Sequence, residues 1–237
     1  MMTCRIKTKL LIKLGVFWLL AFCVLWIALI FKDLISNSIS DMTINLLEYN
    51  YSGVNYLIVV PIIPLLVSCY YFSNNYFPSR YETRDRLVFN ELISNTIICF
   101  VIACIHELIN AIGLIVINAK LSAKSLLFYG LINVITITIY YLRCTFIFSI
   151  FNNFFEKNIS LLLTFLLYFV EAVIVKNYLL LNWMPCDDVS VYYDLLFKQN
   201  TYYQVGMVLL RNIFTSLAIF LLALILHRKK DFIDETK

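Results

Sequence analysis

Six long blocks of apolar residues constrain this chain more than any other feature of its sequence. An α-helix needs roughly 20 mostly apolar residues to cross the hydrocarbon layer of a bilayer, and each block approaches or reaches that length. The blocks are continuous rather than alternating, which argues against a β-barrel. We therefore predict an all-α fold, a polytopic bundle of about six transmembrane helices. The predicted spans cover residues 14–31, 54–72, 94–117, 126–148, 159–181 and 205–226.

The composition indicates that lipid surrounds these blocks. Hydrophobic residues make up 62% of the 237 residues and charged residues only 14%, with a mean hydropathy of +0.83. Soluble domains are closer to half apolar and a quarter charged, so a water-soluble fold of this chain would expose large apolar patches. The short connections leave no room for a soluble catalytic domain. We expect no enzymatic activity, no cofactor and no nucleic-acid partner.

The seven cysteines show neither a metal-binding nor a disulfide pattern. Five of them lie within the apolar blocks, and the sequence contains no C-x-x-C pair. Cysteine-based metal sites need closely spaced cysteines, and disulfide frameworks need an even number of them. We interpret these residues as small side chains that pack between helices.

The distribution of lysine and arginine predicts the orientation in the membrane. Cytoplasmic loops of membrane proteins are enriched in these residues. With the N-terminus inside, 13 Lys and Arg residues fall on the cytoplasmic side, with Arg143 among them, and six on the other side. An even number of spans then places both termini in the cytoplasm. Because the chain is rich in Ile, Asn, Tyr and Lys, we expect a multi-pass protein of a bacterial plasma membrane.

A polar segment between the second and third blocks predicts a short interfacial helix over residues 79–91, on the cytoplasmic side and running into the third span. Ser79 is followed three residues later by Glu82, which is a capping box that starts a helix. The segment also carries Arg80, Arg84 and Arg86. Such a helix either anchors the chain on lipid head groups or docks on a cytoplasmic partner.

The whole arrangement resembles the permease subunits of type-two ABC exporters. The shared features are a basic N-terminal lead, six spans, the arginine-rich segment 79–91 and a larger outer connection at 182–204. In that family the helix between spans two and three is a coupling helix, which contacts the ATPase and transmits its conformational change to the membrane domain. The resemblance therefore implies that Arg80, Arg84 and Arg86 contact a separate cytoplasmic ATPase subunit, and that the chain forms a homodimer or a heterodimer with a similar permease. The cargo is not specified; peptides and lipid-like molecules are the expected classes.

A second, narrower resemblance lies in the outer connection. The residues Trp183, Pro185 and Asp188 form the pattern W-x-P-x-x-D, which resembles the signature of a family of small bacterial membrane proteins named for it. Trp183 suits the membrane interface, Pro185 fixes a turn, and Asp188 is suited to cap a following helix. The motif is interpreted either as a structural re-entrant loop or as a substrate gate.

Four ionisable side chains are predicted within the spans: His106, Glu107, Glu171 and Arg211. Such residues are costly in lipid and are functional candidates by default. A carboxyl group that faces the bundle is expected to pair with Arg211 or His106, or to be protonated. The alternatives are a contact that locks helices together and a path for protons or polar cargo. H-E-x-x-H zinc chemistry is not expected because the second histidine is missing.

Two functions from different classes stay open. The first is the transport subunit described above, which needs a partner for ATP hydrolysis because the chain has no G-x-x-x-x-G-K-[ST] motif. The second is a non-transporting immunity or accessory protein of the membrane. A proton-coupled carrier is a third possibility that depends on Glu171.

Overall fold

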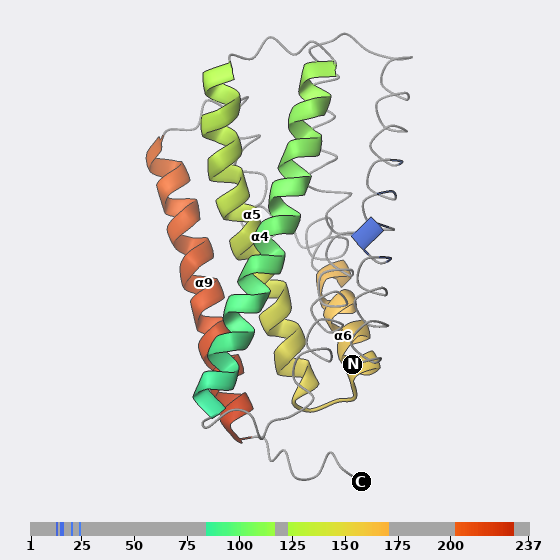
Figure 1. Ribbon diagram of the computed structural model, residues 1–237. Coiled ribbons are helices and arrows are strands. Elements are labelled where there is room, and N and C mark those ends of the chain that lie inside the picture. Colours follow the sequence, from blue (N-terminus) through green and yellow to red (C-terminus); the bar gives the residue numbers. More distant parts are fainter. Residues whose placement is uncertain are drawn as a thin grey trace.

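The computed structural model describes residues 84–116, 123–170 and 202–229, and a few isolated helical positions between residues 13 and 24. This part of the chain forms four helices: α4 (Arg84–Val116), α5 (Ala123–Asn152), α6 (Lys157–Phe169) and α9 (Tyr202–Lys229). Figure 1 shows α4, α5 and α9 as long rods that lie side by side. The predicted all-α class is confirmed for the described residues.

Three of these helices contain apolar stretches long enough to cross a membrane. The stretches are Leu92–Ile112 in α4, Gly130–Asn152 in α5 and Tyr203–Leu226 in α9. They coincide with the predicted spans 94–117, 126–148 and 205–226, and each helix begins before its predicted span. The described part of α6 covers the first half of the predicted span 159–181. The spans predicted at 14–31 and 54–72 lie outside the described residues, apart from the isolated positions.

Helix α5 is the centre of the described bundle. It packs against α4, α6 and α9, whereas α4 and α9 meet over only a few residues. A short turn over residues 153–156 connects α5 to α6, and the amide of Phe155 closes it by donating to the carbonyl of Phe151 at 2.9 Å. Figure 1 shows that α4 and α6 run opposite to α5, and that α9 runs parallel to it.

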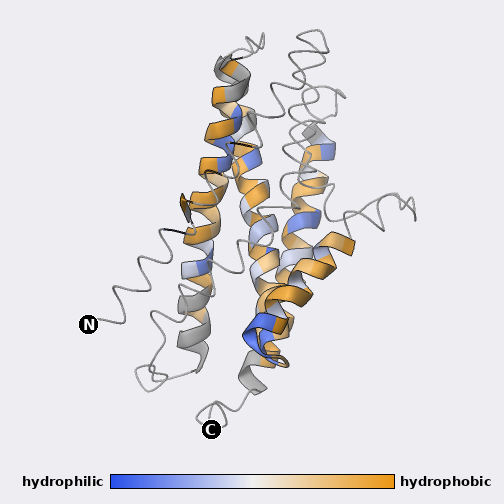
Figure 2. Ribbon diagram, turned by 90° about the vertical axis from the view of Figure 1, so that its right-hand side faces the viewer, coloured by the Kyte–Doolittle hydropathy of each residue, from blue (hydrophilic) through white to orange (hydrophobic). Residues whose placement is uncertain are grey.

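Positive charges gather at one end of the bundle. The first residues of α4 and α6 and the last residues of α5 and α9 lie together at the lower end in Figure 1. Within the described helices, the Lys and Arg residues near this end are Arg84, Arg86, Lys157, Arg228 and Lys229, and only Lys124 lies near the other end. Polar residues where α5 ends and α6 begins give the blue patch at the base of α6 in Figure 2.

The orientation argument counted Arg143 with the cytoplasmic flanks, although the predicted span 126–148 already encloses this residue. Helix α5 continues to Asn152, so that Arg143 lies inside the apolar stretch and not at its end. Its side chain is only 2% exposed. Arg143 is therefore an arginine buried within the bundle rather than a charge that flanks a span.

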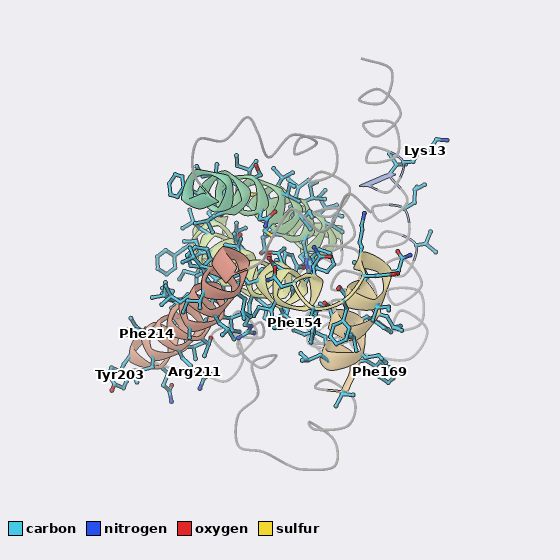
Figure 3. All side chains as sticks on the ribbon, turned by 90° about the horizontal axis from the view of Figure 1, so that it is seen from below. Lys13, Phe154, Phe169, Tyr203, Arg211 and Phe214 are labelled. Atoms are coloured by element: carbon cyan, nitrogen blue, oxygen red, sulfur yellow. The ribbon has the colours of Figure 1, made fainter. Side chains whose placement is uncertain are left out.

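The described bundle has a polar interior and an apolar surface. Within the apolar stretches of α4 and α5, every exposed side chain is hydrophobic. On α9, Phe214 is 65% exposed, and Figure 3 shows it at the periphery. The buried residues include 13 polar or charged side chains against 12 hydrophobic ones, the reverse of what water would favour. Together with the length of the helices, this pattern defines a membrane-embedded α-helical protein.

Candidate functional site: a polar core between three helices

Nine of the buried polar side chains of α4, α5 and α9 make up what we call the polar core. They come from the helix faces that meet at α5, and ionisable residues lie among them. Polar groups buried in a membrane bundle need partners inside the protein because lipid offers none. The members of the polar core are Asn95, His106, Glu107, Asn110, Asn133, Thr136, Arg143, Asn212 and Ser216.

Between α4 and α5, the carboxyl group of Glu107 is held by α5. The amide nitrogen Nδ2 of Asn133 donates to Oε2 of Glu107 at 2.5 Å. One turn earlier on α5, Gly130 leaves room for the carboxyl: a Cβ atom at this position would lie 3.3 Å from Oε1 of Glu107. The pairing of a glycine and an amide on one helix face thus gives Glu107 a fitted place.

His106, the residue before Glu107, also contacts α5, through Tyr141. Its Nδ1 lies 3.0 Å from the hydroxyl of Tyr141, and both side chains are fully buried. The contact is a hydrogen bond whose donor depends on the tautomer of the imidazole. His106 and Glu107 are consecutive residues, so both bonds fix the rotation of α4 about its own axis relative to α5.

Between α5 and α9, polar side chains of α9 bind the backbone of α5. Asn212 Nδ2 donates to the carbonyl of Thr136 at 3.2 Å, and the hydroxyl of Ser216 donates to the carbonyl of Ile139 at 3.4 Å. Asn212 and Ser216 are four residues apart and therefore share a helix face. We call this row of contacts the α5–α9 seam.

Arg143 joins the seam to α6. Its Nη1 donates to the hydroxyl of Thr215 at 3.4 Å, and its guanidinium carbon lies 4.7 Å from the ring centroid of Tyr140. The Tyr140 ring in turn meets the edge of Tyr168 on α6, with centroids 5.8 Å apart. One charged residue thus links side chains from α5, α6 and α9.

The predicted site residues lie partly in this region. His106 and Glu107 are in the polar core, and Arg211 is half-buried on the outer side of α9 (Figure 3). Arg84 and Arg86 lie in the first turn of α4, which runs without a break from residue 84 into the span. The remaining predicted site residues lie outside the described part of the chain: Arg80, Glu171, Trp183, Pro185 and Asp188.

The sequence analysis did not identify several residues of the polar core as site candidates. Asn133, Thr136 and Asn212 carry no charge, and Arg143 was counted among the charges on the cytoplasmic side. A signal was present: Thr136, Tyr140 and Arg143 recur at helical spacing, so they share one face of α5.

The chemistry of the polar core is that of hydrogen bonding and charge. Among the described residues, no three His, Cys, Asp or Glu side chains are grouped in a way that would hold a metal ion. Scans of protein-family models, curated proteins and solved structures found no match to this chain. The site is therefore interpreted from its own residues.

Proposed function

We propose that the chain is the membrane-spanning subunit of an ABC-type exporter, driven by a separate ATPase at the positively charged end of the bundle. The observation that carries the proposal is the continuity of α4 from that end to the polar core. Residues 84–91 precede the apolar stretch that starts at Leu92. Eight helical residues extend about 12 Å, so α4 reaches beyond the hydrocarbon layer.

This continuity gives a mechanical route from a partner to the core. A helix is stiff along its axis, and a displacement applied near Arg84 and Arg86 is carried along α4 to His106 and Glu107. The bonds of these two residues to α5 depend on the rotation of α4. In the proposal, an ATPase bound to residues 84–91 rearranges the polar core and opens a path for cargo.

The proposed orientation places the charged end in the cytoplasm, since lysine and arginine are retained on that side of the membrane. A bacterial plasma membrane, a dimeric assembly and a peptide or lipid-like cargo belong to the same proposal. The apolar exterior of α9 suits contact with lipid or with a second permease.

The proposal is tested by isolating the full chain in mild detergent with an affinity tag. We expect it to retain a cytoplasmic protein that carries a Walker A motif and hydrolyses ATP, and we expect Arg84→Glu to abolish that association. Lys124→Glu, a charge reversal at the opposite end of the bundle, is the matched control and should leave it intact. A gene for such an ATPase beside the gene for this chain would support the same conclusion.

The contrary result favours an accessory or immunity protein. In that case the chain is isolated alone, it keeps its cellular effect when ATPase genes are deleted, and Arg84→Glu and Lys124→Glu behave alike.

A further inference from the structure

Two exposed phenylalanines lie side by side in the sequence of the short turn between α5 and α6. Phe154 is 64% exposed and Phe155 is 48% exposed, although the turn belongs to the end of the bundle where positive charges gather. Figure 3, which shows the bundle from this end, labels Phe154. Apolar rings that stay in water keep their surface hydrated, which is unfavourable. The pair therefore marks a surface that contacts something other than water.

The backbone of the turn presents the two rings in a fixed position. The amides of Phe154 and Phe155 both donate to the carbonyl of Phe151, at 3.0 and 2.9 Å. The carbonyl of Phe155 accepts from the hydroxyl of Ser160, 3.3 Å away. These bonds would have to break before the backbone could turn the rings back toward the bundle. The exposure of the pair is thus built into the hydrogen bonding of the turn.

The pair continues an apolar stripe on the outside of α6. Ile159, Leu162 and Leu166 are exposed, and their spacing of three and four residues places them on one face of the helix. The buried side chains of α6 all carry a hydroxyl group, so the helix turns its apolar residues outward, as a helix in lipid does. Phe154 and Phe155 extend this outward apolar surface past the first residue of α6.

The two rings lie at the depth of the membrane interface. The apolar stretch of α5 ends at Asn152. The bond from the amide of Phe155 to the carbonyl of Phe151 keeps the chain as compact as a helix, so the pair lies only about 3–5 Å beyond the stretch. The head-group layer on each side of the hydrocarbon is about 5–8 Å thick. The pair therefore falls within this layer.

Charged neighbours oppose any deeper position of the turn. Glu156 and Lys157 directly follow the pair, with Glu156 exposed and Lys157 half-buried. Charged groups resist transfer into hydrocarbon, whereas phenyl rings resist transfer into water. A segment that combines both groups is most stable at the boundary between head groups and acyl chains.

We propose that Phe154 and Phe155 form an interfacial anchor, a surface that docks into the head-group layer of the phospholipid leaflet at the charged end of the bundle. The partner is the lipid surface itself. Because the turn joins the central helix α5 to α6, the anchor sets the depth of both helices in the membrane. This inference is independent of an ATPase partner.

The test places a tryptophan at each position of the full chain in vesicles of phosphatidylcholine and phosphatidylglycerol. Subtracting the emission of the unsubstituted chain, which has three tryptophans, leaves the emission of the new indole. Lipids brominated near the carbonyl end or near the methyl end of the acyl chain quench the indole according to its depth, and iodide quenches it from water. Leu162→Trp, about 8 Å along α6 from its first residue, is the deep reference.

We expect Phe154→Trp and Phe155→Trp to lose about half of their emission to the carbonyl-end lipids and clearly less to the methyl-end lipids and to iodide. Leu162→Trp should lose more to the methyl-end lipids. The proposal is overturned if iodide quenches both turn variants as strongly as it quenches N-acetyltryptophanamide in buffer and the bromolipids do not. That result would place the pair in water and assign it to a soluble protein partner.

Replacement of both phenylalanines tests the anchoring role. With Phe154→Ser and Phe155→Ser the turn loses its affinity for the interface, so α6 should move toward water. Leu162→Trp in this background should then be quenched less by the methyl-end lipids and more by the carbonyl-end lipids. Phe154→Tyr with Phe155→Tyr keeps two rings that favour the interface, and this matched control should retain the original profile. An unchanged profile in the serine background would overturn the proposal.

Discussion

The guanidinium group of Arg143 lies over the ring of Tyr140, with the guanidinium carbon 4.7 Å from the ring centroid. The same guanidinium donates to Thr215 of α9, and the same ring packs edge-on against Tyr168 of α6. A buried arginine needs partners that compensate for its lost hydration. The face of an aromatic ring is one such partner, because its quadrupole is negative toward the cation.

Tyr140→Leu is therefore expected to destabilise the bundle. The variant loses a desolvated cation–π contact of about 2 kcal/mol and an aromatic pair of about 1 kcal/mol. The measurement is unfolding in mixed micelles of mild detergent and dodecyl sulfate. In an Arg143→Met background, the loss of unfolding free energy caused by Tyr140→Leu should be smaller by about 2 kcal/mol. Equal costs in both backgrounds would show that the two residues are not coupled.

The α5–α9 seam should respond to loss of a single amide. Asn212→Leu removes the donor to the carbonyl of Thr136, and interhelical hydrogen bonds in membranes contribute about 0.6 kcal/mol on average and up to about 1.7 kcal/mol. Ile213→Leu, at the neighbouring exposed position, is the control and should change the unfolding free energy little. If both variants unfold alike, the seam does not hold α9.

The bond between His106 and Tyr141 is isolated by Tyr141→Phe. This change keeps the ring and removes the hydroxyl, so the expected loss is about 0.5–1.5 kcal/mol of unfolding free energy. Tyr203→Phe is the matched control, because Tyr203 is 75% exposed at the start of α9. The contact would be energetically irrelevant if the two tyrosine variants were equally stable.

Orientation is tested with single cysteines at the two ends of the bundle, in a chain whose native cysteines are replaced. Lys124→Cys lies where α5 begins and Lys157→Cys where α6 begins. If the charged end is cytoplasmic, a membrane-impermeant maleimide labels Lys124→Cys in intact cells and labels Lys157→Cys only after permeabilisation. The reverse pattern would refute the predicted orientation.

The sequence predicts the three described spans because length and apolar character alone define a helix that crosses lipid. It also identifies His106 and Glu107, since ionisable residues are conspicuous in an apolar block. It does not predict their partners. Glu107 was expected to pair with Arg211 or His106 or to be protonated, and the structure adds a bond from Asn133 that depends on the register between α4 and α5.

Arg143 shows why the remainder of the site is harder to predict. It was counted with the charges that flank spans although the predicted span 126–148 encloses it, and the structure shows its side chain buried inside the apolar stretch of α5. The resemblances to exporter permeases and to the W-x-P-x-x-D family stay predictions. The second of them rests on residues outside the described part of the chain.

The central claim is that lipid surrounds the apolar exterior and that the polar core is enclosed. It is tested most directly by a nitroxide at Leu217, which lies half-exposed on α9 beside the buried Ser216. In liposomes, the account predicts that membrane-soluble oxygen relaxes this spin label much more strongly than a water-soluble nickel complex. Stronger relaxation by the nickel complex would place the face in water and contradict the account.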